Sequence, residues 1–444
     1  MRKAFFMKRT ILTFLALAIS CLSFAQQQIT TYYTPKKKVV KEKYNILGGD
    51  STRIHGDYVK YFMEGGVSVE GKFEDGKPIG TFTEYYENGE LLQKLSYKDG
   101  KKTGPFEIYS RSGKPIQKGE HIDGLLQGVV TSYYEDGTKK TETQFTANIS
   151  NGPAKEYFPN GKLKTEFTYK QGKQDGVAKT YHQTGELSSE FTYREGVIIG
   201  EYKTYYRNGQ VEYEYLYVDG YKNGPFKNYD GDGSLVIEGT YVDGIIDGVY
   251  KSYYLDGALK EDFIFQKGAK IGKNTTYYET GEVMKVENYT KITQDVTIDE
   301  YYVSGAIKKK EIYVNAAKNG TWTTYHENGR VKNTIPYSNG AVNGFVKYYN
   351  DQGVLEKQAP WQYNRNTGVE TAFYPNGRVQ RTTNIIKGRK SGIHTEYYPT
   401  KQMKVKGNHR YDLREGTWTY YNEKGKVIKT ERYSRGKLVS SSDN

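Results

Sequence analysis

Aromatic and β-branched residues recur along this chain in runs of about seven residues, separated by polar turns that contain glycine. One such turn is "EYYENGELL", residues 84–92, and close copies follow as "SYYEDGTKK", "EYFPNGKLK" and "TYYRNGQVE". Runs of this composition are typical of β-strands, and Asn-Gly or Asp-Gly between two of them is typical of a hairpin because both residue types tolerate positive φ. The pattern predicts successive β-hairpins.

The hairpins repeat every 24 residues, and sixteen repeats run from Gly56 to Val439 without insertion or deletion. We number the positions of each repeat from its first residue, which is position 0. Position 5 is tyrosine in every repeat except that of Phe373, position 9 is glycine except at Lys401, position 11 is usually aliphatic and position 17 is mostly aromatic. Position 0 is glycine except at Val296, and these glycines are Gly56, Gly80, Gly104, Gly128, Gly152, Gly176, Gly200, Gly224, Gly248, Gly272, Gly320, Gly344, Gly368, Gly392 and Gly416.

Two strand registers compete for the hairpin. A two-residue loop would place position 3 opposite position 14 and create cross-strand charge pairs. A three-residue loop, made of a type I turn followed by a glycine bulge, would place position 5 opposite position 11, with the aromatic residue at position 17 on the same face. We favour the bulged register because it accommodates proline at position 7, as in Pro159. The pairs expected from the first register are Lys155 with Glu166, Lys179 with Glu190, Lys203 with Glu214, Lys227 with Glu238, and Lys251 with Asp262.

A hairpin of this size is not stable alone, so each one must pack against its neighbours. The predicted fold is therefore all-β: an elongated single-layer array of about sixteen hairpin repeats, twisted into a ribbon or solenoid-like form. Residues 56–439 would make up this array. Residues 26–55 read as a polar, basic, flexible leader, and residues 440–444 as a disordered tail.

The repeats resemble MORN repeats, specifically the variant found in bacterial proteins, some of which are labelled antitoxin-like. "GTFTEYYENGELLQKLSYKDGKKTG" is similar to one such unit, and about 384 of the 444 residues fit the pattern. The resemblance implies successive antiparallel hairpins and a role in interaction instead of catalysis. It departs from the eukaryotic MORN repeats linked to lipid contact, because position 2 is often glycine there and is Phe82, Tyr202 or Trp322 here.

The first 25 residues have the features of a secretory signal peptide. A basic start precedes the apolar run from Ile11 to Leu22, which is too short to span a membrane. Cleavage is expected between Ala25 and Gln26, which would leave the protein in the periplasm, in the cell envelope or outside the cell without a transmembrane span. The alternative is lipidation of Cys21, which is the only cysteine, so the cleaved chain would contain neither disulfides nor thiolate metal sites.

Composition and motifs argue against an enzyme. The cleaved chain would carry 61 Lys and Arg residues against 52 Asp and Glu residues, interleaved in a way that does not indicate nucleic-acid binding. Five of the six histidines replace aromatic residues of the repeat, which indicates a packing or surface role, and no catalytic, cofactor-binding or metal-binding motif is present. "DGDGSLVIEG", from Asp230, lacks the bend glycine and the final glutamate of a calcium loop, where Leu235 and Tyr241 stand.

We therefore expect an exported, non-enzymatic protein that acts as an elongated protein-binding or scaffolding surface in the cell envelope. The alternatives are an immunity-type protein that binds a toxin, and a protein that contacts an envelope glycan or an anionic lipid. An intermittent aromatic strip at position 6, on the face opposite the constant tyrosines of position 5, is the candidate binding surface. Its residues are Tyr86, Tyr134, Tyr206, Tyr254, Tyr278 and Tyr302.

Overall fold

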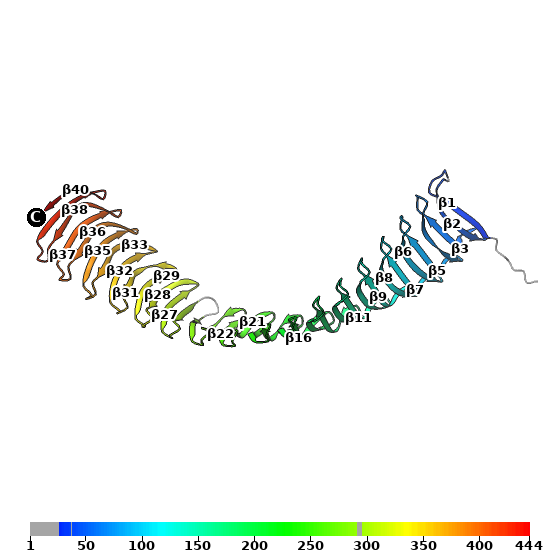
Figure 1. The fold of residues 1–444 in the computed structure, drawn as a ribbon, viewed down its shortest axis with the longest axis horizontal. Coiled ribbons are helices and arrows are strands. Elements are labelled where there is room, and N and C mark those ends of the chain that lie inside the picture. The colour runs from blue at the N-terminus through cyan, green and yellow to red at the C-terminus, as the bar shows by residue number, and fades with distance from the viewer. Residues whose placement is uncertain (1–25, 37, 291–294) are drawn as a thin grey trace, which may run out of the picture. The chain divides into compact units, whose positions relative to one another are not determined.

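The computed structural model describes residues 26–36, 38–290 and 295–444. Two compact parts can be distinguished, Met1–Gly185 and Glu186–Asn444. The described residues form 40 strands and no helix, and within each part the strands lie side by side in one open antiparallel layer (Figure 1). This confirms the predicted all-β repeat array. The predicted signal peptide, with Cys21 and Ala25, lies outside the described residues.

The N-terminal part contains fourteen strands, which pair in chain order from β1 to β12, and both β13 and β14 pair with β12. Their bounds are β1 (Gln26–Tyr32), β2 (Val40–Leu47), β3 (Asp50–Tyr61), β4 (Val67–Glu74), β5 (Lys77–Tyr85), β6 (Leu91–Lys98), β7 (Lys101–Tyr109), β8 (Pro115–Ile122), β9 (Leu125–Tyr133), β10 (Lys139–Thr146), β11 (Ile149–Tyr157), β12 (Leu163–Lys170), β13 (Lys173–Gln174) and β14 (Gly176–Tyr181).

The C-terminal part continues the same repeat. Its strands are β15 (Leu187–Arg194), β16 (Val197–Tyr205), β17 (Val211–Val218), β18 (Tyr221–Lys222), β19 (Gly224–Tyr229), β20 (Leu235–Val242), β21 (Ile245–Tyr253), β22 (Leu259–Gln266), β23 (Ala269–Lys270), β24 (Gly272–Tyr277), β25 (Val283–Tyr289), β26 (Val296–Tyr301), β27 (Ile307–Val314), β28 (Ala317–Tyr325), β29 (Val331–Ser338), β30 (Ala341–Val342), β31 (Gly344–Tyr349), β32 (Leu355–Gln362), β33 (Arg365–Asn366), β34 (Gly368–Phe373), β35 (Val379–Ile386), β36 (Arg389–Tyr397), β37 (Met403–Arg410), β38 (Leu413–Tyr421), β39 (Val427–Ser434) and β40 (Lys437–Asp443).

The tip of each hairpin has the predicted three-residue loop. In the repeat of residues 152–175, the Gly161 N–H donates to the Phe158 carbonyl at 2.9 Å, and the Phe158 N–H donates to the Lys162 carbonyl at 2.8 Å. Gly161 has φ 82°, whereas Asn160 does not have a positive φ. The Asn160 side chain instead accepts a hydrogen bond from the Lys162 N–H at 3.1 Å. The asparagine of the Asn-Gly pair is therefore used for its side-chain oxygen, and only the glycine for its backbone freedom.

The strands behind the tip combine the two competing registers. Tyr157 pairs with Leu163, as the bulged register predicts, but Lys155 pairs with Glu166, as the other register predicts. The shift is absorbed by a β-bulge at Lys164, which opposes no residue of its own on the partner strand. This bulge adds to the glycine bulge of the tip. As a result, position 17 pairs with position 0 and lies on the face opposite positions 5 and 11. The expectation that all three share one face was wrong.

A different turn connects one hairpin to the next. Asp219 and Gly220 form a two-residue loop with φ values of 48° and 83°, which is the type I′ geometry that matches the twist of the flanking strands. A second irregularity follows at position 0, where Gly224 has φ 112° and a Cβ atom would come within 2.7 Å of Leu216 Cδ2. Glycine recurs at position 0 because the backbone there has a positive φ in each case, and at Gly224 the side chain at position 16 also leaves no room for a Cβ atom.

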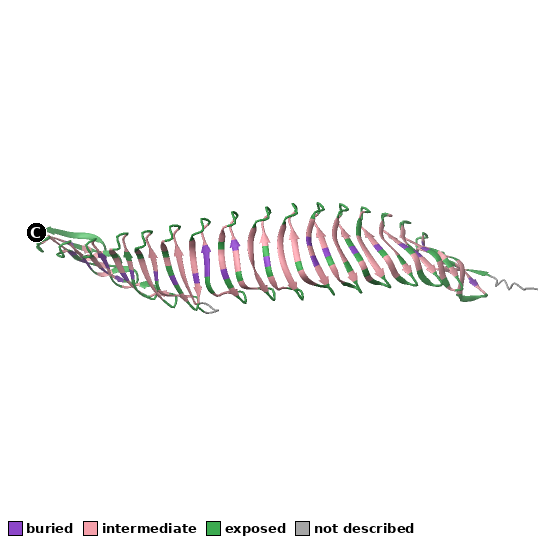
Figure 2. Cartoon of the chain, turned by 90° about the horizontal axis from the view of Figure 1, so that it is seen from below, coloured by how far each residue is buried: buried purple, intermediate pink, exposed green. Residues whose placement is uncertain are grey.

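The side chains at positions 2, 15 and 17 form what we call the aromatic face, which contains most of the buried apolar residues. Phe106 and Phe226 are each 4% exposed and Trp418 is 1% exposed. Phe226 covers Gly239 of the paired strand so closely that a Cβ atom there would lie 2.7 Å from the ring. Buried residues lie within the strands of each part and exposed residues gather at the turns (Figure 2).

Cations at position 22 cover the rings of the aromatic face. The Lys222 ammonium lies 3.4 Å from the centroid of Tyr215 and 5.3 Å from that of Tyr241, and burial lowers the pKa of Lys222. Lys318 and Arg414 contact Trp322 and Trp418 in the same way, at 4.4 Å and 4.3 Å. A one-layer sheet has no second layer to close its core, so these long side chains shield the rings from water.

Both ends of the chain differ from expectation. Residues 26–55 were expected to be a flexible leader, but β1, β2 and the beginning of β3 lie within them, and Gln26 of β1 pairs with Leu47 of β2. The tail of residues 440–444 was expected to be disordered, but β40 extends to Asp443, where it pairs with Lys429. In both cases the polar composition predicted an unstructured segment. A strand forms nevertheless, because it gains backbone hydrogen bonds from the sheet edge whatever its side chains are.

Candidate binding surface

The side chains at positions 1, 3, 5, 14 and 16 form the opposite face of the sheet, which we call the Lys/Glu face. In the C-terminal part, lysines at position 3 and acidic residues at position 14 pair across every strand boundary between β15 and β22. The result is an unbroken row of alternating charge. Its members are Glu190, Lys203, Glu214, Lys227, Glu238, Lys251 and Asp262.

The N-terminal part contains a shorter row of the same kind, in which Glu142, Lys155, Glu166 and Lys179 are paired in succession. Four of the five predicted lysine–acid pairs are therefore confirmed as cross-strand neighbours. The fifth, Lys179 with Glu190, stays a prediction, because Lys179 belongs to the N-terminal part and Glu190 to the C-terminal part. In one pair, Lys203 Nζ lies 3.4 Å from Glu214 Oε1, and it also lies 3.3 Å from Glu201 Oε2.

The tyrosines at position 5 hold these acidic side chains in place. The Tyr157 hydroxyl donates to Glu142 at 2.6 Å, and the Tyr253 hydroxyl donates to Glu238 at 2.7 Å. Burial and this hydrogen bond raise the pKa of each tyrosine to about 12, so both phenols stay protonated donors at neutral pH. The constant tyrosine of the repeat thus orients the carboxylate of the preceding repeat.

Shallow depressions lie along this face at equivalent places in both parts. One, of about 270 Å³, is lined by Glu201, Lys203, Leu216, Pro225 and Lys227 among others. Another, of about 220 Å³, is lined by Pro153, Lys155, Thr168, Val177 and Lys179 among others. Each combines an apolar residue at position 1 with charges at positions 3 and 14, and position 16 is Leu216 in the first and Thr168 in the second.

Apolar side chains at positions 1 and 16 are left open to solvent on the Lys/Glu face. Val177, Val249 and Ile264 are 52%, 51% and 37% exposed. The sequence analysis did not single out these positions, although their repeated Val, Pro, Leu and Ile were a signal that could have been read. The face offers an apolar row beside a charged row, a combination suited to an extended partner.

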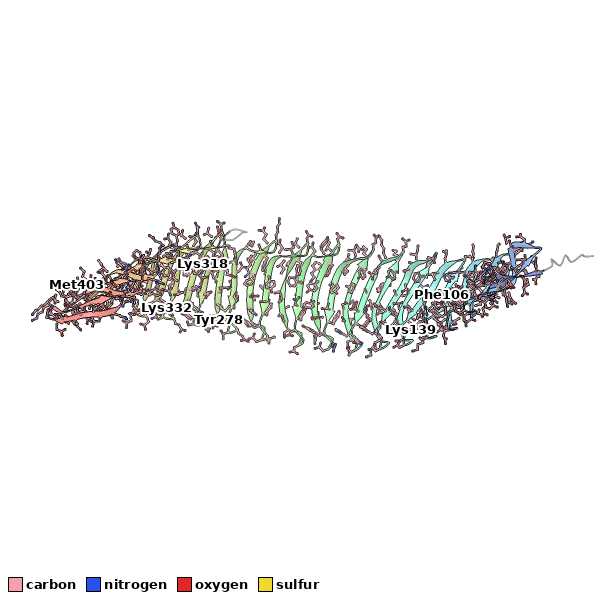
Figure 3. All side chains as sticks on the ribbon, turned by 90° about the horizontal axis from the view of Figure 1, so that it is seen from above. Phe106, Lys139, Tyr278, Lys318, Lys332 and Met403 are labelled. Atoms are coloured by element: carbon pink, nitrogen blue, oxygen red, sulfur yellow. The ribbon has the colours of Figure 1, made fainter. Side chains whose placement is uncertain are left out.

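The predicted aromatic strip at position 6 lies at the hairpin tips, where its hydroxyls bind the neighbouring repeat. Figure 3 shows Tyr278 at one edge of the C-terminal part and Lys139 at an edge of the N-terminal part. All six predicted tyrosines are half-buried. Each hydroxyl donates to the carbonyl of the position 5 residue one repeat later: Tyr86 to Tyr109, Tyr134 to Tyr157, Tyr206 to Tyr229, Tyr254 to Tyr277, Tyr278 to Tyr301 and Tyr302 to Tyr325.

These bonds give the position 6 tyrosines a structural task, because the hydroxyls are already engaged within the sheet and only ring edges are left for a ligand. Asparagines at position 8 bind in parallel: Asn208 Nδ2 donates to the Gly231 carbonyl at 2.6 Å, and Asn328 Nδ2 to the Asp351 carbonyl at 2.7 Å. These side-chain hydrogen bonds connect the tips of neighbouring hairpins along the sheet. Binding by these six tyrosines stays a prediction.

One cluster has the order of a catalytic triad but is closed to substrate. Thr383 Oγ1 lies 2.8 Å from His394 Nδ1, and His394 Nε2 lies 3.2 Å from Glu396 Oε1. Thr383 is only 2% exposed and His394 only 5%. The His394 and His409 rings pack at 5.1 Å from one another and against Trp418. This cluster is part of the aromatic face, as the packing interpretation of the histidines predicted.

Two further searches over the described residues gave no site. No group of three or more His, Cys, Asp or Glu side chains is arranged to hold a metal ion in the part of the chain that the structure describes. Across residues 26–36, 38–290 and 295–444, no helix is long and apolar enough to cross a membrane.

Comparison with protein families identifies the repeat. The model of the MORN repeat variant matches eight segments of this chain, residues 78–99, 126–147, 150–171, 174–195, 199–219, 222–243, 318–339 and 414–435. These eight segments are MORN-variant repeats. Each matched segment covers the strand that leads to the hairpin tip, the tip itself and the returning strand. Repeats between the matched segments keep the same 24-residue spacing.

Solved structures add little to this assignment. A chain in "Crystal Structure of TcdB2-TccC3-Cdc42" is 10% identical with a TM-score of 0.15, over 95% of this chain and 31% of that chain. A chain in "Crystal Structure of TcdB2-TccC3" is 11% identical with a TM-score of 0.14, over 95% and 24%. The chain thus spans about a third or less of these two chains, and scores this low carry no argument about function. No curated protein matches the sequence.

Proposed function

We propose that this MORN-variant protein is an exported, non-enzymatic scaffold that binds another protein along its Lys/Glu face. The observation that carries the proposal is that apolar residues at positions 1 and 16, such as Pro225, Val249 and Ile264, lie beside the alternating charges at positions 3 and 14, with the polar Glu201 and Thr240 among them. Repetition over successive strands provides a long surface of one chemical character, and the depressions on it are shallow in comparison with ligand pockets.

The mechanism follows from this geometry. An extended partner segment would place apolar side chains over the row that includes Val249 and Ile264, and its polar groups over the neighbouring charges. Each contact is weak, because an exposed ion pair contributes only about 0–1 kcal/mol. Several repeats bound together would sum to a specific interaction, with affinity that depends on the number of repeats engaged.

A photo-crosslinking experiment tests the face. A photoreactive phenylalanine is placed at Val249, on the Lys/Glu face, and in a matched variant at Leu255, which lies in a tip loop and is 81% exposed. Each full-length variant is expressed in its native host and irradiated. The proposal expects a discrete protein adduct from position 249 and none from position 255. Adducts from position 255 alone, or equal adducts from both, would place binding elsewhere.

The same experiment separates the alternative functions. A toxin domain in the adduct at position 249 would support the immunity-type alternative, whereas polysaccharide or lipid in that adduct would contradict protein binding. Export is tested independently by fractionating the cells and sequencing the N-terminus of the mature protein. An envelope or extracellular chain that begins at Gln26 is expected, and a cytoplasmic chain that begins at Met1 would refute export.

A further inference from the structure

Positive charge is concentrated at the C-terminal end of the repeat array. Residues 320–444 hold 21 Lys and Arg residues against 10 Asp and Glu residues, whereas residues 26–319 hold 40 against 42. The preceding repeats are therefore balanced, and the excess belongs to the last five. Such segregation is an electrostatic feature that local ion pairing within the sheet does not require.

Many of these cations lie on one edge of the sheet, at the type I′ turns that join successive hairpins. We call this set the basic turn edge. The charged groups of its members are exposed, and none has an ion-pair or hydrogen-bond partner among the described residues. The members are Arg365, Lys387, Arg389, Arg410, Arg435 and Lys437.

The first residue of the type I′ turn, position 19, changes along the C-terminal part. It is acidic at Glu195, Asp219 and Asp243, and is then Lys267, Asn315 and Asn339. In the last repeats it is Tyr363, Lys387, Tyr411 and Arg435. The change from acid to cation or tyrosine occurs at a position whose backbone geometry is constant, so the turn itself does not demand it.

Two tyrosines interrupt the cations and project from the edge. Tyr363 is 74% exposed and Tyr411 is 63% exposed, in contrast to the half-buried tyrosines of the two faces. Ile386 and Leu413, at neighbouring turn positions, are 55% and 48% exposed. Aromatic rings and cations thus alternate along a protruding edge that packing leaves open.

We propose that the basic turn edge binds a linear acidic polysaccharide. Each repeat occupies two strands, so equivalent turns recur at roughly 9–10 Å along the edge. Arginine pairs with carboxylate or sulfate groups through two parallel hydrogen bonds, and an exposed tyrosine presents a flat ring to the C–H face of a sugar. The surface is separate from the Lys/Glu face and does not depend on protein binding there.

The spacing favours a polysaccharide over nucleic acid. A nucleic-acid strand carries one phosphate about every 3.4 Å, and single-strand binding surfaces stack successive bases on closely placed rings. Here about two cations are available in each repeat, and Tyr363 and Tyr411 are two repeats apart. A polymer with one charge on every one or two sugars has a lower charge density, which matches that of the edge.

Two charge-matched variants of residues 26–444 test the proposal. The first carries Lys387→Gln, Arg389→Gln, Arg435→Gln and Lys437→Gln. The control carries Lys401→Gln, Lys404→Gln, Lys424→Gln and Lys426→Gln, which remove the same charge from the tip edge of the last two repeats. Binding to polygalacturonate is measured by calorimetry at low and moderate salt, with poly-dT, anionic phospholipid vesicles and the protein itself as competing probes.

We expect the first variant to lose about tenfold or more in affinity for polygalacturonate and the control about threefold or less, because screening limits the influence of distant charges. Tyr363→Ala with Tyr411→Ala should weaken binding further at moderate salt. Equal loss in both charge variants, absence of polygalacturonate binding, or tighter binding to poly-dT, vesicles or a second copy would overturn the proposal. None of these outcomes bears on the crosslink at position 249.

Discussion

The Tyr254 hydroxyl donates a 2.8 Å hydrogen bond to the backbone carbonyl of Tyr277, one repeat further along the chain. Equivalent bonds occur at the other position 6 tyrosines, and His326 makes a comparable contact with the Tyr349 carbonyl at 3.1 Å. The side chain that the sequence offered as a binding group thus ties the tips of adjacent hairpins together. In an array with no second layer, such links add to the backbone ladder and hold neighbouring repeats in register.

Removing this hydroxyl should loosen the local tip. Tyr254→Phe deletes one hydrogen bond and keeps the ring, so we expect a loss of about 1 kcal/mol in the stability of β22 and β24. Hydrogen exchange of the amides in these strands is the appropriate measurement, because a repeat array opens locally. Tyr363→Phe is the control, since that ring is 74% exposed, and it should change little. Equal effects would contradict the structural task assigned to position 6.

The glycine at position 0 should be replaceable only where space permits. Gly224→Ala meets both a φ of 112° and Leu216 Cδ2 at 2.7 Å, whereas Gly200→Ala meets a φ of 70° with no atom within 4 Å. We expect backbone strain to lower the free energy of unfolding by about 1–2 kcal/mol in Gly200→Ala, and we expect a larger decrease in Gly224→Ala. Denaturant unfolding followed by circular dichroism measures both. The addition of Leu216→Ala should recover part of the loss at Gly224 only, and similar costs at both glycines would argue against the predicted clash.

The repeat should be removable only as a whole. Deletion of residues 320–343 joins Asn319 to Gly344 and recreates the Asn-Gly junction of the next repeat, so a folded, shorter array is expected. Deletion of residues 320–331 removes the strand end and the tip, leaving β29 without its hairpin partner β28 intact. Thermal melts by circular dichroism should show one cooperative loss near the parent temperature for the first and a weakened or broadened transition for the second. Equal damage would refute the modular description.

Stability should fall below neutral pH through the His394–His409 cluster. Burial lowers the pKa of His409 from 6.5 to about 4, helped by His394, Lys390 and Arg414, with Asp412 opposing. Burial also lowers the pKa of His394, which Glu396 opposes. The unfolded chain binds protons first as the pH falls, so stability is complete above about pH 6.5 and is lost progressively down to about pH 4.

Melting temperatures at pH 7.5 and pH 5.0 measure this effect above the range where most carboxylates titrate. The parent should melt a few degrees lower at pH 5.0 than at pH 7.5. The variant His394→Phe with His409→Tyr restores residue types found at positions 2 and 17 of other repeats, as in Phe82 and Tyr97, and should lose most of that difference. An undiminished pH dependence in this variant would assign it to other groups.

The sequence by itself determined the repeat, its 24-residue length and the hairpin with a three-residue tip. These follow from local chemistry: Gly161 supplies the positive φ of the tip, and runs of aromatic and β-branched residues form the strands. The same local rules also predicted the Lys155–Glu166 pairing, although they could not combine it with Tyr157 opposite Leu163. Local propensity does not reveal a bulge in a strand that carries no special residue at that point, and Lys164 is ordinary in sequence.

Only the tertiary structure decided which face each side chain occupies and which groups are already bound. The bulge at Lys164 reverses the face of every residue between it and the next turn, so Tyr169 lies opposite the predicted side, with the aromatic face. The Tyr254 hydroxyl donates to a carbonyl 23 residues further along the chain. The polar residues 26–55 and 440–444 form strands because they pair with neighbouring strands. These outcomes depend on contacts between strands, and a sequence records the strands but not the hydrogen bonds that one strand makes to the next.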